Sequence, residues 1–409
     1  MKISYLFSQF PVPTQTFAVS DIAALQELGH EVIVHTIKPP PKKGVSSHET
    51  SELKNDLKIY RPALSRVWRW PALLWRWRRQ VVRLLGKCVR AMPRNAAAAS
   101  VAILCLPRIF EIVEEIEESG SDVVHLFWSR HASLVLDVLA DTKAPPVRSA
   151  FVGAYDLVAD DFLVETAAES AVVLFSHTEA NRPYLEGKSA PGKAIRIIHR
   201  GIPLVPPAGD VRRDPDVWIS VSALVAAKNV GAVIRLFADT RASRPELRLR
   251  ICGEGPERSK LEDLAAELGC RHAVQFMGHV DRSQVFELLQ GAQLFLLLST
   301  KASERLPNVV KEAMWCGCAI IISPTEGIAE LVPDEQIGMI VDPANREALA
   351  RAAASILGES EAAVELRRER VRALISDRFS SKGSMERYAA AWEEARRPVV
   401  GVGAQRDVS

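Results

Sequence analysis

The hydrophobic positions divide the first half of the chain into short apolar runs separated by longer amphipathic segments. The apolar runs are rich in Val, Ile and Leu: KISYLFS, EVIVHTI, DVVHLFW, VRSAFVG, AVVLFSH and AIRIIHR. Continuous runs of this length predict strands of a parallel sheet that is buried on both faces. Segments with helical periodicity separate most of them, for example TFAVSDIAALQELG, which ends at Gly29. The alternation predicts an α/β fold with helices on both faces of the sheet.

The same alternation restarts in the second half, after the Pro-, Gly- and Asp-rich stretch PLVPPAGDVRRDPD. The later apolar runs are VWISVSAL, ELRLRICG, AVQFMGHV, AQLFLLLS, CAIIISP and IGMIVD. We therefore predict two Rossmann-like domains, over residues 1–203 and 217–376, joined by a linker at 204–216. A last helix is predicted over 377–397, followed by a tail at 398–409.

Length and composition agree with two domains. The chain has 409 residues, and its net charge of only +2 gives no indication of a nucleic-acid-binding protein. Its six cysteines form no CxxC pair, so Cys316 and Cys318 are interpreted as structural thiols rather than zinc ligands. The start MKISYLFSQF resembles a first strand more than a signal peptide, and the apolar run at 96–106 is too short to span a bilayer. We expect a soluble or peripheral protein in a reducing cytoplasm.

Candidate binding residues follow predicted strands of the second domain, where open α/β sheets bind their ligands. Gly253 and Gly255 in CGEGPER lie between a strand and a helix, and such glycines let a backbone approach a ligand. The stretch is not a dinucleotide-binding fingerprint, because Arg258 takes the place of its third glycine. A tight turn without a ligand explains the glycines equally well. Lys228 lies just past another strand, within reach of a phosphate.

The stretch ERLPNVVKEAMW places Glu304 before a predicted helix start and Glu312 inside the helix. Free N–H groups at such a start bind anions. A nucleotide sugar would match this layout: its diphosphate at the helix start and Lys228, its ribose hydroxyls at Glu312, its sugar at Glu304. Taken singly, Glu304 and Glu312 are each explained equally well as a solvated surface charge without a ligand. The other donor-binding candidates are Val280, Leu306, Pro307, Asn308 and Val309.

These residues carry a family resemblance. CGEGPERSKLEDLAAELG, VQFMGHVDRSQVFELLQGAQLFLLLS, ERLPNVVKEAMWCGCAII, EGIAELV and GMIVDPANREALARAA resemble the retaining glycosyltransferases of family 4, and Glu304 to Glu312 fits their E-x7-E motif. The opening FPVPTQTFAVSDIAALQELGHEVIVHTI is similar to members that build bacterial exopolysaccharide or lipopolysaccharide. The resemblance implies a GT-B fold, with two Rossmann-like domains facing across a cleft and the C-terminal helix returning to the first. It also implies anomeric retention and no obligatory metal. We expect a UDP- or GDP-sugar as donor and a lipid-linked saccharide as acceptor.

Two positions depart from the family pattern. Ala223 stands where an arginine often precedes the phosphate-binding lysine, and Gly153 stands where a histidine often ends a strand of the first domain. We hypothesise that Arg200, at the end of AIRIIHR, supplies the missing guanidinium; a surface arginine is the alternative. Asp156, which follows Gly153, is a catalytic candidate beside Glu304. Candidates on the acceptor side, each equally explained as structural, are Thr14, Thr16, His125, Tyr155 and His199.

Residues 57–110 contain twelve Lys and Arg and no Asp or Glu, which leaves a net −10 for the rest of the chain. Tryptophans interleave with these cations, a composition typical of a segment that lies in a membrane interface. The membrane-facing candidates are Trp68, Trp70, Trp75, Trp77, Arg76, Arg78 and Arg79. Nucleic acid is the rival partner and a solvated or packed arm the third possibility; we expect a membrane and no nucleic acid. The resulting prediction is a peripheral glycosyltransferase of surface polysaccharide assembly, on the inner face of the cytoplasmic membrane.

Two other functions fit the same sequence. One is a GT-B enzyme with a soluble acceptor, or a sugar-nucleotide epimerase. The other is a catalytically silent GT-B binding protein, which Gly153 and Ala223 would allow.

Overall fold

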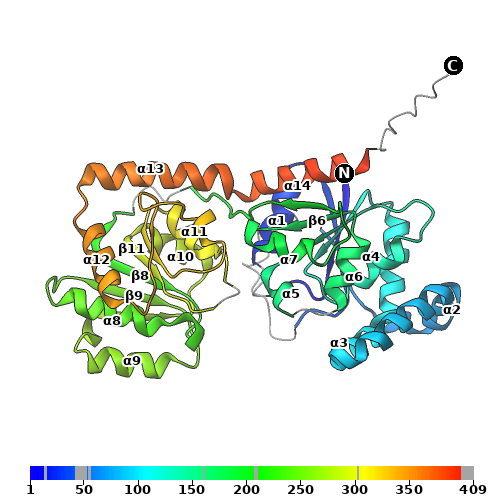
Figure 1. The fold of residues 1–409 in the computed structure, drawn as a ribbon, viewed down its shortest axis with the longest axis horizontal. Coiled ribbons are helices and arrows are strands. Elements are labelled where there is room, and N and C mark those ends of the chain that lie inside the picture. The colour runs from blue at the N-terminus through cyan, green and yellow to red at the C-terminus, as the bar shows by residue number, and fades with distance from the viewer. Residues whose placement is uncertain are drawn as a thin grey trace, which may run out of the picture. The chain divides into compact units, whose positions relative to one another are not determined.

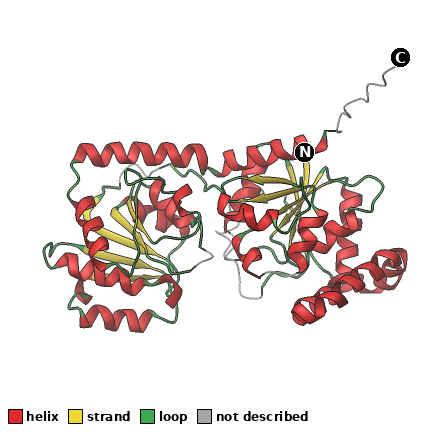
Figure 2. Cartoon of the chain, viewed as in Figure 1, coloured by secondary structure: helices red, strands yellow, loops and turns green. Residues whose placement is uncertain are grey.

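The protein is described by a computed structural model, which defines residues 1–12, 16–41, 53, 57–159, 162–206, 211–301 and 304–397. Thr14 lies outside these residues. The chain divides into two compact units. The first unit comprises Met1–Ser176, Asn181–Ile198 and the chain from Met385 onwards; the second comprises His177–Ala180 and His199–Ser384. Each unit is a parallel sheet between helices, as the alternation of apolar and amphipathic segments predicts (Figures 1 and 2). That the two face each other across a cleft stays a prediction.

The first unit contains a seven-stranded parallel sheet in the order β3-β2-β1-β4-β5-β6-β7. Its strands are β1 (Lys2–Phe7), β2 (Glu31–Thr36), β3 (Lys58–Tyr60), β4 (Val123–Phe127), β5 (Val147–Phe151), β6 (Val173–Ser176) and β7 (Ala194–Ile197). β1 lies between β2 and β4, with Ile3 paired to Val32 on one side and to Val123 on the other. Both faces of this central strand are buried, which explains its uninterrupted apolar sequence.

Helices cover both faces of the first sheet (Figure 2). They are α1 (Thr16–Glu27), α2 (Trp70–Arg76), α3 (Arg78–Ser119), α4 (Ser133–Leu139), α5 (Ala154–Ala159), α6 (Phe162–Ser170), α7 (Arg182–Glu186) and the C-terminal α14 (Ser381–Arg396). Most of α14 packs on this unit: Trp392 donates to Ser149 Oγ at 2.9 Å, and the Tyr388 ring stacks 4.1 Å from that of Phe175. Buried aromatic contacts therefore hold the helix to the sheet.

The basic stretch forms an arm of helices on the first unit. It contains the 3₁₀ helix η3 (Leu64–Arg69), then α2 and the first part of α3. The backbone of α3 leaves the helical conformation at Asn95 and resumes afterwards. Among the described residues, one helix, α3, is long and apolar enough by length and composition to cross a membrane, and half of its apolar window is buried. Its buried side includes Leu84, Cys88 and Ala99.

The second unit contains a six-stranded parallel sheet in the order β10-β9-β8-β11-β12-β13. Its strands are β8 (Asp214–Val221), β9 (Arg248–Cys252), β10 (Val274–Gly278), β11 (Ala292–Leu297), β12 (Ala319–Ile322) and β13 (Met339–Ile340). Its helices are α8 (Val230–Arg241), α9 (Arg258–Glu267), α10 (Arg282–Gln290), α11 (Asn308–Trp315), α12 (Arg346–Leu357) and α13 (Glu361–Arg378). β8 and β11 are neighbours in this sheet, so the loops after them emerge at the same carboxyl edge.

Candidate functional site

Lys228 is held at the carboxyl edge of the second sheet by a short 3₁₀ helix, η5 (Ala226–Lys228), in the loop after β8. The carbonyl oxygen of Ala227 accepts hydrogen bonds from Thr300 N at 2.9 Å and Ser299 Oγ at 3.0 Å. These bonds fasten the loop to the end of β11. The lysine is thereby placed next to the segment that carries Glu304.

Glu304 follows β11 and forms an ion pair with Lys228 through its Oε1 atom. Both side chains are mostly buried, and the second carboxylate oxygen, Oε2, has no hydrogen-bond partner among the described residues. A buried oxygen without a donor retains its capacity to accept a hydrogen bond from a ligand. The two groups that the sequence assigns to the diphosphate and to the sugar are therefore in direct contact.

The helix α11 begins at Asn308, with Pro307 in the extended conformation before it. Its first N–H groups have no acceptor within the helix, which favours an anion at this end. Leu306 is buried and Val309 is half-buried; both pack in the core beneath the helix, as Val280 does after β10. These three apolar residues therefore support the shape of the edge.

Glu312 lies inside α11 and is almost covered. Its Oε1 atom is 3.3 Å from Arg282 Nη2, at the start of α10. Sequence reasoning missed this arginine, because the two residues are brought together only by the packing of α10 on α11. A ribose bound to Glu312 would share the carboxylate with Arg282.

Gly253 and Gly255 allow the loop after β9 to pack closely against the loop after β8. A Cβ atom on Gly253 would lie 1.9 Å from the carbonyl oxygen of Ser222, and one on Gly255 would lie 2.3 Å from that of Leu224. Leu224 N also donates to the carbonyl oxygen of Glu254 at 2.9 Å. The glycines thus let the loop after β9 pack against the loop that carries Lys228, whether or not a ligand approaches them.

A cluster of buried cations lies near the start of α11. Arg200, Arg305 and Lys311 are all buried. The Lys311 ammonium donates to the carbonyl oxygen of Arg200 at 2.7 Å and to Asn308 Oδ1 at 3.1 Å, so it attaches residue 200 to α11. Arg305 pairs with Glu326 at 2.5 Å. Arg305 directly follows Glu304 and Lys311 directly precedes Glu312, so their places next to the motif glutamates are a signal present in the sequence.

His199 belongs to a second polar cluster, around Glu330. His199 Nε2 lies 2.8 Å from Glu330 Oε2, which also accepts from Glu179 N at 3.1 Å. Burial alone would raise the pKa of Glu330, but hydrogen bonds from His199, Thr178 and Glu179 lower it to about 2. Burial also lowers the pKa of neighbouring His177 to about 3, with Lys311 and Arg200 adding to the effect. This cluster attaches residues 177–180 to the second unit.

The candidates in the first unit have structural contacts. His125 is buried among aromatic rings, and its Nδ1 lies 2.9 Å from Ser149 Oγ. Asp156 is buried, and its Oδ2 accepts a hydrogen bond from Gly153 N at 2.9 Å at the start of α5. Tyr155 is half exposed, and Thr16 begins α1. None of these contacts brings the four residues into one site.

The two departures from the family pattern have different surroundings. A Cβ atom on Gly153 would lie 3.3 Å from Phe151 Cε1, so a histidine would press against that ring. Ala223 is exposed in the loop after β8. Packing therefore disfavours the family histidine but offers no reason for the missing arginine.

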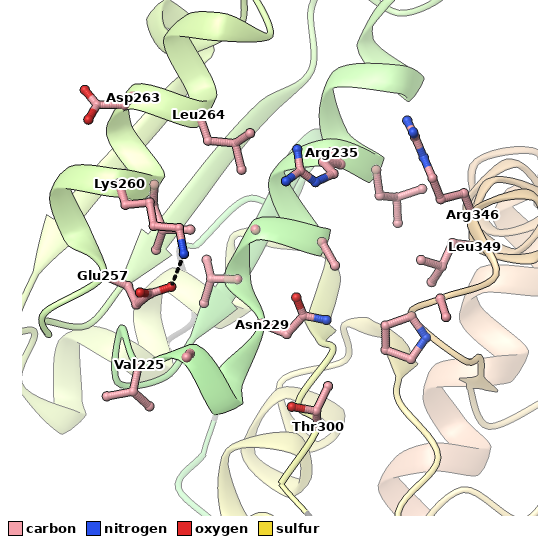
Figure 3. Close-up of a pocket in the computed structure, with 18 of the residues that line it drawn as sticks. Val225, Asn229, Arg235, Glu257, Lys260, Asp263, Leu264, Thr300, Arg346 and Leu349 are labelled. Carbon is pink, nitrogen blue, oxygen red and sulfur yellow. Dashed lines mark hydrogen bonds and ion pairs between the residues drawn. The ribbon is translucent and has the colours of Figure 1, made fainter.

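A pocket on the second unit lies beside this edge (Figure 3). It is lined by Val225, Asn229, Lys260, Thr300 and Arg346, among others, and by none of Lys228, Glu304 and Glu312. In the lining of the pocket, Lys260 Nζ lies 3.3 Å from Glu257 Oε2. Within the described part of the chain, no group of three or more His, Cys, Asp or Glu side chains is arranged to hold a metal ion.

The family model of glycosyl transferases group 1 matches residues 206–372. These residues include β8 to β13 and all the contacts between Lys228, Glu304, Glu312 and Arg282. The second unit therefore contains a group 1 glycosyltransferase domain.

Relatives of the chain resemble it over different lengths. The putative colanic acid biosynthesis glycosyltransferase WcaL of Salmonella typhimurium is 23% identical over 378 residues, covering 86% of this chain and 89% of that protein. The lipopolysaccharide core biosynthesis glycosyltransferase LpsE of Rhizobium meliloti is 28% identical over 179 residues, covering 44% and 50%. Other curated relatives match over less of their length. The chain spans 21% of the exopolysaccharide phosphotransferase of Streptomyces coelicolor and 51% of the glycogen synthase of Mycobacterium tuberculosis.

Solved structures resemble nearly the whole chain. The Anabaena protein HepE in complex with UDP has a TM-score of 0.68 and 16% identity, covering 96% of this chain and all of that one. A glycosyltransferase from Rickettsia africae has a TM-score of 0.66 and 15% identity, covering 96% and 98%. At such identities the likeness is one of fold, and the fold of this chain is GT-B.

Proposed function

We propose that this chain is a retaining glycosyltransferase that moves a sugar from a UDP- or GDP-sugar to a lipid-linked saccharide in surface polysaccharide biosynthesis. It would act at the inner face of the cytoplasmic membrane, where such an acceptor is presented. The observation that carries the proposal is the contact of Lys228 with Glu304 beside the start of α11, inside a group 1 domain. Similarity to WcaL and LpsE supports a role in polysaccharide biosynthesis, and similarity to HepE in complex with UDP supports a nucleotide-sugar donor.

The departing nucleoside diphosphate gains negative charge as its bond to the sugar breaks. The Lys228 ammonium and the free N–H groups at the start of α11 would stabilise that charge, because both are positioned before the reaction begins. The buried Arg200 is the candidate for a second positive contact. Charge stabilisation by these groups requires no metal ion in the proposed mechanism.

The sugar gains positive charge as the same bond breaks. Glu304 would lie at this sugar and stabilise the charge, or position the hydroxyl groups beside it. A two-carboxylate hydrolase would need both carboxyl groups to flank one bond. Glu312 is instead occupied by Arg282 and is assigned to the ribose, so transfer is favoured over hydrolysis.

The test combines binding, turnover and stereochemistry. Nucleoside diphosphates and their sugars are screened by thermal shift, where a ligand at 100 times its Kd adds about 2.7 kcal/mol of stability. Release of nucleoside diphosphate is then measured with a membrane lipid extract as acceptor, and the anomeric configuration of the product is determined by NMR. Inversion in the product would overturn the retaining assignment, and failure to bind any nucleoside diphosphate would overturn the donor assignment.

The same experiment distinguishes the alternatives. Transfer to a soluble sugar in place of the lipid extract would identify a soluble acceptor, and a donor isomerised without transfer would identify an epimerase. Binding without release or isomerisation would support a catalytically silent protein, for which Gly153 and Ala223 are the motivation.

A further inference from the structure

One side of the basic arm is exposed and carries both arginines and large apolar side chains. We call it the docking face and define it as Trp75, Arg78, Arg79, Val82, Val89 and Arg90. At about 100° per residue, its five members in α3 fall within an arc of about 120°. The buried residues Leu84, Cys88 and Ala91 lie on the opposite side of the helix.

Ion pairs with acids outside residues 57–110 neutralise most of the cations in this stretch. Eight of the twelve Lys and Arg in residues 57–110 have acidic partners outside this stretch: Lys58, Arg66, Arg69, Arg76, Arg83, Lys87, Arg94 and Arg108. The remaining four, Arg61, Arg78, Arg79 and Arg90, form no ion pair with any residue that the structure describes. Three of these four lie on the docking face. The positive charge that is available to a partner is therefore concentrated there.

Apolar side chains lie between these arginines. Trp75, Val82 and Val89 are 73%, 69% and 58% exposed, although each is a residue that normally gains from burial. The Arg78 guanidinium lies 5.5 Å from the centre of the Trp75 ring. Trp68, in η3 just before α2, is 78% exposed. Residues 57–110 contribute no aspartate or glutamate of their own to this surface.

We propose that the docking face binds the headgroup region of an anionic lipid bilayer. The three arginines would contact lipid phosphates, while the indole and the valines would enter the boundary between headgroups and acyl chains. The biological reason for bilayer binding rests on the proposed function, because an enzyme with a lipid-linked acceptor must reach that acceptor at the bilayer. The charge and exposure of the face are independent of that function.

Three of the residues that the sequence analysis expects to face a membrane, Trp70, Arg76 and Trp77, instead make contacts within the first unit. Trp77 is only 9% exposed and stacks on Phe110. Trp70 donates its indole N–H to Glu111 at 2.8 Å, and Arg76 pairs with Glu114 at the same distance. These three residues hold the arm together, so the docking face omits them. Half of the apolar window of α3 is buried against the rest of the chain, which favours a helix that lies on the bilayer over one that crosses it.

The test measures flotation of the full chain with phosphatidylcholine vesicles, with and without phosphatidylglycerol, at low and high salt. We expect binding to the anionic vesicles that weakens as salt rises. Replacing Arg78, Arg79 and Arg90 with Gln should weaken it at least about tenfold, since each arginine near an anionic surface contributes roughly fivefold. Replacing Trp68 and Trp75 with Ala should retain the salt dependence but shorten the residence time of the protein on the vesicles.

The matched control replaces three exposed arginines outside the arm, Arg212, Arg370 and Arg397, with Gln, which changes the net charge equally. It should bind vesicles as the wild-type chain does. Equal loss in both triple variants, or a wild-type chain that ignores anionic vesicles at low salt, would overturn the proposal. Binding to single-stranded RNA with no binding to vesicles would do the same. The thermal shift with nucleoside diphosphates should be unaffected in every variant, so a failure of the proposed donor chemistry is distinguished from a failure of docking.

Discussion

Lys228 and Glu304, which are 76 positions apart in the chain, form an ion pair at the carboxyl edge of the second sheet. The lysine follows β8, and the glutamate follows the adjacent strand β11. A diphosphate that binds Lys228 competes with Glu304 for the same ammonium group. The proposed phosphate contact and the proposed contact with the reacting sugar are therefore coupled, and mutation of either residue tests both.

Replacing Glu304 with Gln should lower kcat about 100-fold, because the carboxylate acts on charge that is present mainly in the transition state. The Kd for the nucleoside diphosphate should change far less than kcat, and any change should be a tightening, because the neutral amide competes less for Lys228. Steady-state kinetics and calorimetry measure the two quantities, with Glu335→Gln, an exposed glutamate of the same unit, as control. A kcat within about threefold of wild type would place Glu304 away from the reacting sugar.

Lys228→Ala should weaken binding of a nucleoside diphosphate about tenfold or more and leave binding of the bare nucleoside unchanged, since the ammonium contacts only phosphate. If Arg200 replaces the arginine missing at Ala223, Arg200→Ala should show the same selectivity, and the two losses should not add. Calorimetry with both ligands makes the measurement. Equal losses for the nucleoside and its diphosphate would indicate misfolding instead.

Glu312→Ala should weaken binding of the nucleoside as well as its diphosphate, by about tenfold for a charged hydrogen bond to the ribose. Arg282→Ala, which removes the 3.3 Å contact to Glu312, is the comparison. It should not reproduce the loss if the ribose is the true partner of the carboxylate. Nucleoside affinity that is unchanged in Glu312→Ala would remove the ribose assignment.

Acid should destabilise the second unit through His177. Its pKa is about 3 in the folded chain, mainly because of burial, and 6.5 is the ordinary value that the unfolded chain retains. The unfolded chain therefore binds a proton between these pH values that the folded chain does not, so stability is complete above pH 6.5 and falls as pH decreases. At about pH 5.5 this loss is about 1.4 kcal/mol relative to about pH 7.5.

Urea unfolding at these two pH values measures the effect. His177→Gln should remove this part of the pH dependence, whereas His279→Gln, an exposed histidine of the same unit, should not. Glu330 acts in a lower window: its pKa is about 2, so its contribution is lost only as pH falls below about 4.5. Identical pH dependence in wild type and His177→Gln would contradict the assignment.

The sequence by itself determined twelve of the thirteen strands that the structure describes, because apolar runs and helical periodicity are local properties of the chain; it missed the short edge strand β3. It also placed Lys228 after one strand and Glu304 and Glu312 around a helix start, since the parallel βα order brings strand ends to one edge. The GT-B fold follows from the same alternation and from the family resemblance. These inferences depend on spacings of a few residues.

Only the tertiary structure decided which charged groups meet. Arg282 reaches Glu312 because α10 packs beside α11, and residues 177–180 join the second unit through Glu330. Residues 57–110 contain twelve cations and no acid, yet the folded chain supplies acidic partners from outside this stretch for eight of them. Ion pairing depends on distances of a few ångströms between side chains, and residues far apart in sequence reach such distances only after the chain has folded.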